Sequence, residues 1–126
     1  MDPTERISNA ELEVMKLLWQ GDKPLSFGEI RLALGKARGW EKSTVNTLVH
    51  RLVGKGAVCV QQGPPARYAP ALTYAQYAQA EDRRFIDKLY GGSAKALVAG
   101  LCQRGQLSEA DIDELKAFFQ MGGGKT

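Results

Sequence analysis

The chain has 126 residues, 44% of them hydrophobic, and its 17 Lys and Arg against 14 Asp and Glu give a net charge of +3. This length allows one core with an appendage or two very small cores, and so small a charge does not by itself indicate a nucleic-acid partner. The N-terminus lacks the apolar run of a secretory signal, no apolar run is long enough to span a membrane, and the two cysteines match no disulfide or metal-site pattern. We therefore expect a cytoplasmic protein without a membrane segment, a cofactor or a metal site.

Two short helices are expected near the N-terminus. Ser8 with Glu11, and Ser26 with Glu29, form the capping-box pattern that starts a helix, because each side chain can accept a hydrogen bond from the other residue's backbone N–H. Gly39 then ends the second helix. The apolar residues expected on the inner faces are Ala10, Val14, Leu17 and Leu18 in the first helix and Phe27, Ile30, Leu34 and Ala37 in the second.

The third predicted helix, residues 42–55, carries the most informative pattern. Its apolar residues fall at i, i+3, i+4 and i+7, which is the spacing of a helix with one face in a core. The opposite face carries short polar side chains with a histidine and an arginine, which suit contacts with base edges and phosphates. The apolar residues are Val45, Leu48, Val49 and Leu52, and the polar ones are Ser43, Asn46, Thr47, His50 and Arg51.

A β-hairpin is expected directly after this helix. Residues 57–62 and 66–71 form short strand patterns on either side of a Gly-Pro-Pro turn, and Arg67 lies in the second strand. A helix followed by a hairpin with a basic tip is the arrangement in which a winged helix-turn-helix binds DNA. The alternatives that these residues leave open are a small domain of another kind and a winged helix that binds a protein partner.

Positive charge is concentrated on this region. Between residues 36 and 67, six basic residues stand against one acidic residue, Glu41, which gives a local net charge of +5. Such a focused positive field favours a polyanionic partner, whereas a protein-binding face would be more apolar and aromatic. The basic residues are Lys36, Arg38, Lys42, Arg51, Lys55 and Arg67.

Three further helices are expected toward the C-terminus. Thr73, Ser93 and Ser108 are good N-caps, and glycines at positions 91, 92 and 105 separate the helices. Each helix carries an apolar stripe, yet a segment of about 50 residues rarely stabilises itself alone. The simplest partner is the same segment of a second copy, in a two-fold dimer, and the alternative is packing against the first domain. The residues predicted to form the dimer interface are Phe85, Leu89, Leu97, Leu101, Ile112, Leu115, Phe118 and Phe119.

Together these elements predict a mainly α-helical fold with a small β-hairpin wing. The first domain, residues 1–72, is a winged helix-turn-helix, and Pro70 to Thr73 mark its end. The second domain, residues 73–126, is a three-helix dimerisation domain that ends in a flexible tail.

Other chemistry is not favoured. Residues 122–126 (GGGKT) match the end of a phosphate-binding loop, but that motif needs a glycine where Phe119 stands and a helix after its Lys-Thr, so a flexible tail is expected. Cys59 and Cys102 are expected to be buried as small apolar side chains, and a redox switch at Cys102 is the alternative. His50 is the only histidine, and no nucleophile is paired with a base, so we expect no catalytic residue and no enzyme.

Four segments carry a resemblance to a known family. They are ISNAELEVMKLLW (7–19), Gly39-Trp40 followed by STVNTLVHRLVGKGA (43–57), the wing sequence RYAP (67–70), and FIDKLYGGSAKALV (85–98). The chain resembles the penicillinase and methicillin-resistance repressors of the BlaI/MecI type, in collinear order over nearly its whole length. This resemblance implies a homodimer whose N-terminal winged helix binds an inverted-repeat DNA operator, whose C-terminal helical domain dimerises, and which represses antibiotic-resistance or stress genes.

The resemblance also implies roles for individual residues. Residues 42–55 match the family's recognition helix, in which Arg51 is the side chain best able to bind guanine through two hydrogen bonds. Thr44 and Thr47 also match residue types usual in this helix, and Arg67 matches a wing arginine that contacts a phosphate or the minor groove. The remaining predicted DNA contacts are Ser43, Asn46 and His50, at polar positions that vary in the family, and Lys42 and Lys55, chosen by charge and location.

The departures from the family concern the inducing signal. Antibiotic-responsive members are cut in the dimerisation domain by a sensor protease at an Asn-Phe bond, and the aligned pair here is Gly100-Leu101. Copper-responsive members carry a pair of Cys-x-Cys motifs, which this sequence lacks. A sensor protease is therefore retained as a candidate partner, and copper sensing by that route is not expected.

Overall fold

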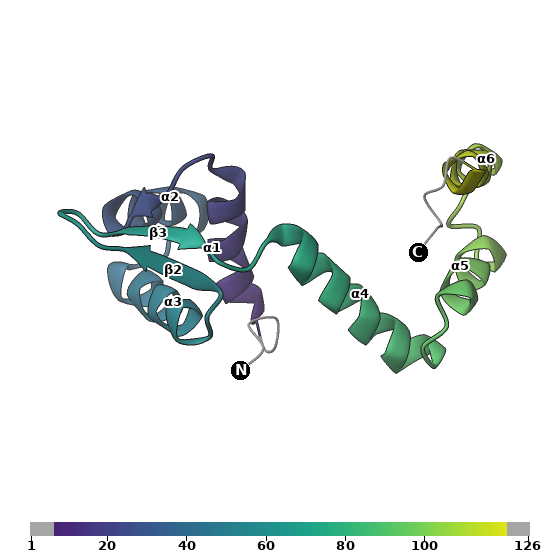
Figure 1. Cartoon of the computed structure of the whole chain (residues 1–126), viewed down its shortest axis with the longest axis horizontal. Coiled ribbons are helices and arrows are strands. Elements are labelled where there is room, and N and C mark those ends of the chain that lie inside the picture. The colour runs from purple at the N-terminus through teal and green to yellow at the C-terminus, as the bar shows by residue number, and fades with distance from the viewer. Residues whose placement is uncertain (1–6, 121–126) are drawn as a thin grey trace. The chain divides into compact units, whose positions relative to one another are not determined.

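Residues 7–120 are the part of the chain that the computed structural model describes, and they form six helices and three strands (Figure 1). The chain divides into two compact units, the first ending at Glu81 and the second starting at Asp82. The tail predicted to be flexible, residues 122–126, lies outside the described residues. The helices are α1 (Asn9–Gln20), α2 (Phe27–Arg38), α3 (Lys42–Gly54), α4 (Tyr74–Tyr90), α5 (Ala94–Gln103) and α6 (Glu109–Phe118), and the strands are β1 (Leu25–Ser26), β2 (Val58–Gln61) and β3 (Arg67–Pro70).

The first two helices begin at the predicted capping boxes. The backbone N–H of Glu11 donates to Ser8 Oγ (3.0 Å), and the backbone N–H of Ser8 donates to Glu11 Oε1 (2.8 Å). Ser26 and Glu29 make the same reciprocal pair, at 3.2 and 2.8 Å. Gly39, with φ 69°, ends α2 in the left-handed region that glycine adopts most easily. The predicted starts of both helices and the end of α2 are therefore confirmed.

The third helix is amphipathic in the predicted sense. Its four apolar residues, Val45, Leu48, Val49 and Leu52, are at most 5% exposed, and the helix packs against both α1 and α2. Gly56, with φ 80°, then turns the chain into β2. The core thus holds one side of α3 and leaves its polar side outside.

The three strands form an antiparallel sheet in the order β1-β3-β2. β2 and β3 are the predicted hairpin, in which Val60 pairs with Tyr68 and Gln61 with Arg67, and the wing turn at residues 62–66 joins them (Figure 1). The sequence does not predict β1, because two residues are too few for an alternating pattern and their partners in β3 are distant in the sequence.

The hydrophobic core of the first unit lies between α1, α2, α3 and the sheet. Met15 is completely buried, although the predicted stripe of α1 omits it. Ala37, expected on the inner face of α2, is exposed; that expectation is wrong because, in the last turn of a helix, a single methyl group has little apolar area to bury. The buried hydrophobic residues are Val14, Met15, Leu18, Ile30, Leu34, Val45, Leu48, Val49, Leu52, Ala57, Val58 and Leu72.

Trp19 ties the start of α4 to this core. Its Nε1–H donates to the carbonyl oxygen of Leu72 (2.9 Å), and its ring lies 5.3 Å from that of Tyr74 and 5.6 Å from that of Tyr77, between centroids. The first unit therefore continues to Glu81, beyond residue 72. The division of functions at residue 72 stays a prediction.

The last three helices begin at the predicted caps. Thr73 and Gln76 exchange two hydrogen bonds (2.9 and 3.0 Å) at the start of α4. Ser93 Oγ accepts the N–H of the third residue of α5, and Ser108 forms a capping box with Asp111 at α6. The predicted starts of α4, α5 and α6 are therefore confirmed.

Candidate nucleic-acid interface

The polar face of α3 is exposed over its whole length. Since the apolar stripe is held in the core, the helical period directs the other side chains outward. The exposed residues include all the predicted contacts from Lys42 to Arg51: Lys42, Ser43, Thr44, Asn46, Thr47, His50 and Arg51.

Two side chains on this face differ in what they can offer a ligand. The hydroxyl of Thr47 donates to the carbonyl oxygen of Ser43 (3.0 Å), so a ligand meets only its acceptor lone pairs and its methyl group. Within residues 7–120, the side chain of Arg51 makes no ion pair or hydrogen bond. Its five N–H donors are therefore available to a partner.

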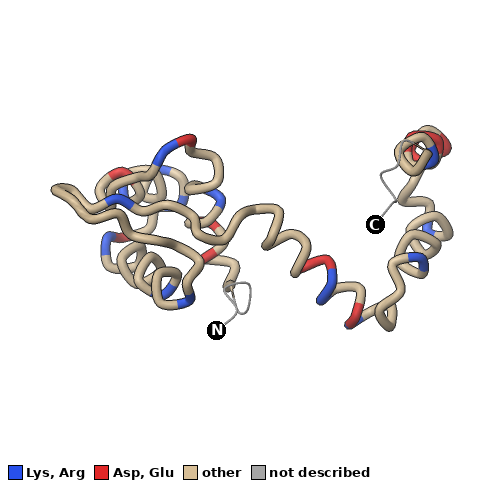
Figure 2. Tube along the Cα trace, viewed as in Figure 1, with Lys and Arg blue, Asp and Glu red and all other residues tan. Residues whose placement is uncertain are grey.

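Lys42 lies in the first turn of α3, beside a cleft that Glu41, Ser43 and Asn46 also line. Glu41 occupies the N-cap position without a side-chain hydrogen bond to the helix. Lysine and arginine, blue in Figure 2, lie toward both ends of α3, with Lys42 at one end and Arg51 near the other. Lys42 thus adds to the partial positive charge that a helix carries at its N-terminus.

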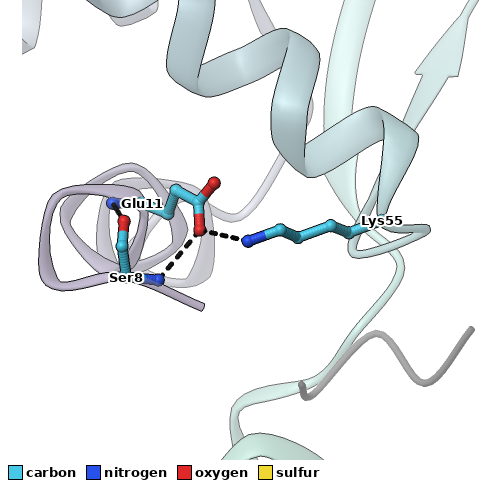
Figure 3. Close-up of polar contacts among 3 residues, drawn as sticks. All are labelled: Ser8, Glu11 and Lys55. Carbon is cyan, nitrogen blue, oxygen red and sulfur yellow. Dashed lines mark hydrogen bonds and ion pairs between the residues drawn. The ribbon is translucent and has the colours of Figure 1, made fainter. Parts of the chain in front are cut away.

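Lys55 makes an ion pair with a buried carboxylate. Its Nζ lies 2.6 Å from Oε1 of Glu11, the same oxygen that accepts the backbone N–H of Ser8 (Figure 3). The Glu11 side chain is only 2% exposed. Burial raises the pKa of Glu11, but the hydrogen bonds and charge supplied by Lys55 and Ser8 outweigh burial and hold the pKa below its usual value. The pair ties the end of α3 to the start of α1, and a phosphate could bind Lys55 only in competition with Glu11.

Arg67 joins the wing to α2. Its Nη1 lies 3.3 Å from Oε1 of Glu29, and both side chains are nearly half exposed. The backbone N–H of Ser26 lowers the pKa of Glu29, and the nearby charge of Arg67 lowers it further. An exposed ion pair of this kind adds little stability, so Arg67 can exchange Glu29 for a phosphate at small cost.

Arg31 is a candidate contact that the sequence interpretation missed. It is exposed on α2 and lines a groove of about 490 Å³ together with Lys36 and Lys42. The run of positive charge in the sequence begins at Lys36, so it leaves Arg31 out. Helical spacing could have found it, since residues 31, 32, 35 and 36 share one face of a helix.

The second unit leaves its apolar side chains uncovered. Among the residues of α4, α5 and α6, only Gly100 is buried. An apolar groove of about 430 Å³ runs along α5, lined by Val98 and Phe119 among others. Of the predicted interface residues, Leu97, Leu101 and Ile112 are partly buried, and Phe85, Leu89, Leu115, Phe118 and Phe119 are 38–60% exposed.

Both cysteines are exposed free thiols, so the expectation that they are buried is wrong. The alternation of β2 places Val58 in the core and therefore turns Cys59 outward. Cys102 lies in the last turn of α5, a helix that buries only Gly100. Apolar character alone did not bury these thiols, because their places in β2 and α5 decide their exposure.

Neither a metal site nor a membrane segment occurs in the described part of the chain. Residues 7–120 hold no group of three His, Cys, Asp or Glu side chains that could bind a metal ion. No helix within this range is both long enough and apolar enough to cross a membrane.

Known proteins resemble this chain over most of its length. The family profile described as penicillinase repressor matches residues 7–121. The chain is 31% identical to the penicillinase repressor of Bacillus licheniformis over 116 residues, which cover 91% of this chain and 90% of that protein. It is 30% identical to the methicillin resistance regulatory protein MecI of Mammaliicoccus sciuri over 114 residues, with 90% and 92% covered.

Two solved structures resemble part of the chain, each at 33% identity and covering 61% of this chain and 94% of the other. One is the solution structure of the DNA-binding domain of the repressor BlaI, with a TM-score of 0.55. The other is the monomeric form of Bacillus licheniformis BlaI in complex with the blaP half-operator, with a TM-score of 0.53. The predicted winged helix-turn-helix fold is therefore confirmed, and the chain belongs to the penicillinase repressor family.

Proposed function

We propose that this protein is a homodimeric transcriptional repressor that binds an inverted-repeat DNA operator. The observation that carries the proposal is the exposed polar face of α3, whose Arg51 side chain has no partner within residues 7–120, on a helix whose other face is fixed in the core. A rigid helix with such a face fits the major groove, where base edges offer hydrogen-bond donors and acceptors. The similarity to a BlaI complex with a half-operator supports DNA binding by this chain.

The residues of the interface differ in their proposed roles. Arg51 binds a guanine through two hydrogen bonds, a contact worth about 1–3 kcal/mol of discrimination. Thr47 presents its methyl group and lone pairs to a base, because its hydroxyl proton is already donated to Ser43. Lys55 is the weakest candidate, since Glu11 holds its ammonium group. The remaining contacts are Ser43, Thr44, Asn46 and His50 in the groove, and Lys42 and Arg67 on phosphates.

The dimer is proposed to form through residues 73–126. The exposed apolar side chains of α4, α5 and α6 need a cover, and a second copy supplies one with the same composition in a closed two-fold arrangement. The two DNA-binding domains of a dimer match the two half-sites of an inverted repeat. Once one domain is bound, the other binds its half-site at a high effective concentration, which raises the apparent affinity for the operator. The protein would then act with the DNA in the cytoplasm, on antibiotic-resistance or stress genes.

Loss of the dimer is the proposed route to derepression, and a sensor protease is one candidate cause. The bond that aligns with the cleavage site of antibiotic-responsive members joins Gly100 to Leu101 inside α5. Gly100 is buried, and a Cβ placed on it would lie 3.0 Å from the guanidinium of Arg104. A protease acts on locally opened chain, so cleavage at this bond requires α5 to unfold around it.

The proposal is tested by selecting bound duplexes from a random pool with the purified full chain, at two salt concentrations. Enrichment of an inverted repeat, with affinity that falls steeply as salt rises, is the expected result, because bound phosphates release counterions. The selected sequence then identifies the operator.

The competing function is a winged helix that docks on a protein. The penicillinase repressor family consists of repressors rather than enzymes, so catalysis is not the alternative to test. If no sequence is enriched and binding is weak at both salt concentrations, DNA recognition by α3 is excluded and the docking function takes its place.

A further inference from the structure

A groove of about 490 Å³ lies where α2 meets the start of α3. Arg31 and Lys36 come from α2, and Lys42 is the first residue of α3. Among the described residues that line the groove, Glu41 is the only carboxylate against these three cations. The groove therefore carries a net positive charge, and its Lys42 side lies beside the face proposed to read bases.

The sequence of α2 keeps this groove open. Arg31, Leu32, Gly35 and Lys36 fall on one face of the helix, with Gly35 between the two cations. A glycine inside a helix lowers its stability relative to alanine, so a structural reason for the residue is expected. A Cβ at Gly35 would lie 3.8 Å from the carbonyl oxygen of Trp40, in van der Waals contact, and a longer side chain would extend from the wall of the groove that Gly35 lines.

The cations of the groove are available for a ligand. None of Arg31, Lys36 and Lys42 forms an ion pair within residues 7–120. This distinguishes them from Lys55 and Arg67, whose charges are held by Glu11 and Glu29. Lys42 lies on α3 itself and Arg31 and Lys36 lie on α2, so the groove extends the unpaired positive charge of the described residues from α3 onto α2.

We propose that this groove binds the DNA backbone beside the bases read by α3, through phosphate contacts of Arg31 and Lys36 in addition to Lys42. The inference rests on the proposed function, because the occupant is a phosphate of the same operator. An open, positively charged groove at the edge of a recognition helix suits a phosphate, which needs charge and hydrogen-bond donors but no shape-matched pocket. Such contacts fix the position of the helix on the duplex and carry no sequence information.

The test compares the full chain with its Arg31→Gln and Lys36→Gln variants, which remove charge but keep a side chain of similar length. The probes are the duplex enriched by selection, a duplex with one of its half-sites, and a scrambled duplex of equal length. On the half-site, each substitution is expected to weaken binding about eightfold near 0.1 M salt and to reduce the slope of log Kd against log salt by about 0.9. On the inverted repeat the slope change doubles, since both copies lose a contact.

Two further variants serve as controls. Arg31→Lys keeps the charge and is expected to retain the affinity and slope of the unmodified chain. Lys16→Gln removes a positive charge from α1, outside the groove, where Lys16 pairs with Glu13 (3.5 Å), and it is expected to change neither quantity. Circular dichroism establishes that the variants are folded, as expected for substitutions at exposed positions.

The outcomes separate this inference from the proposed function. Equal loss on enriched and scrambled duplexes, together with the reduced slope, supports phosphate binding in the groove. If both Gln variants have the affinity and slope of the unmodified chain, while Arg51→Ala binds the enriched duplex more weakly, then α3 contacts DNA and the groove does not. A loss confined to the enriched duplex would also overturn the inference, because it would make these residues base contacts. Failure of the unmodified chain to enrich any sequence would instead refute the proposed function.

Discussion

The two units of this chain treat apolar side chains in opposite ways. Among its described residues, the first unit buries twelve hydrophobic residues in one core, and seven of these twelve are less than 2% exposed. In the second unit, Phe85, Leu89, Phe118 and Phe119 are each about half exposed, at 47–60%, although its helices are as well capped as those of the first. Well-formed helix caps thus occur both in the unit with a buried core and in the unit whose apolar side chains are exposed.

The difference indicates where each unit obtains its stability. Helix caps fix where a helix starts but contribute only about 1 kcal/mol each, so a small helical unit depends on apolar burial. The first unit achieves that burial within one chain. The described residues of the second unit do not, and in the proposed dimer a second copy would cover their exposed apolar side chains.

The largest expected effect comes from a charge in the open apolar surface. Leu115→Asp, at a residue 38% exposed on α6, should separate the dimer, because a carboxylate would have to be buried in the interface. Loss of linkage then weakens operator binding by about 100- to 10,000-fold. Sedimentation gives the oligomeric state, and titration of the selected duplex gives the affinity.

Leu32→Asp is the matched control for the sedimentation measurement alone, because Leu32 lines the proposed phosphate-binding groove and a carboxylate there would itself weaken DNA binding. Leu32 is 62% exposed on α2 in the first unit, so the same substitution should leave the oligomeric state unchanged. A Leu115→Asp variant that still sediments as a dimer would refute the placement of the interface on α6. If both Leu115→Asp and Leu32→Asp are monomeric, the dimer interface includes part of the first unit as well.

A truncation in the closed core should act on folding instead of assembly. Leu52→Ala removes a side chain that is 0% exposed and should lower the free energy of unfolding of the first unit by about 2–5 kcal/mol. Leu89→Ala, at a residue 57% exposed, should leave that unit unchanged and weaken only the dimer. Both tryptophans, Trp19 and Trp40, lie in the first unit, so fluorescence during urea unfolding measures its stability. If Leu52→Ala and Leu89→Ala lowered the free energy of unfolding of the first unit equally, the two units would not unfold independently.

Much of the fold is predictable because its signals are local. The capping boxes of Ser8 and Ser26, the glycine that ends α2, and the amphipathic stripe of α3 each depend on a few neighbouring residues. β1 is not predictable in this way, since its two residues become a strand only by pairing with β3. The exposure of Cys59 and Cys102 likewise depends on tertiary placement and not on residue type.

The candidate site was predictable on α3 and less so around it. The exposed polar face follows from helical period alone, so Arg51 and its neighbours could be named from the sequence. The ion pair that distinguishes Lys55 from these residues could not be predicted, because its partner Glu11 is distant in the sequence and its sequence context predicts only a helix cap. Arg31 was missed because the run of positive charge begins at Lys36; helical spacing places Arg31 on the same face as Lys36, and the packing of α2 against α3 brings both beside Lys42.

Glu11 offers a test of how the first unit holds its recognition helix. Glu11→Gln keeps an oxygen that can accept the N–H of Ser8 but removes the charge that binds Lys55, so the free energy of unfolding should fall by about 1.5–3 kcal/mol at neutral pH. Since the pKa of Glu11 is lowered on folding, its contribution is present above its usual value of 4.5 and is lost as pH falls through the lower folded value. The unmodified chain and the variant should therefore converge in stability as the pH falls below the folded pKa of Glu11.

Glu29→Gln is the control for this experiment. Glu29 has the same capping role and also binds an arginine, but it is exposed, so its substitution should have a smaller effect on stability. Urea unfolding of the three proteins between neutral and acidic pH decides the matter. A constant difference between Glu11→Gln and the unmodified chain at every pH would show that lost packing, and not the ion pair, is responsible.

The smallest expected effect is on DNA sequence recognition, from a substitution that leaves the folding of both units unchanged. Arg51→Ala should leave folding and the dimer intact, because the side chain is exposed and unpaired within the described residues, and should cost about 1–3 kcal/mol on the selected operator. Its control is the set of duplexes that differ from the operator at one base pair each. The variant should no longer distinguish the duplexes at one position, because the guanine that Arg51 reads loses its two hydrogen bonds. A uniform loss on all of these duplexes would instead make Arg51 a phosphate contact, and the specificity of α3 would then depend on Ser43, Asn46 and His50.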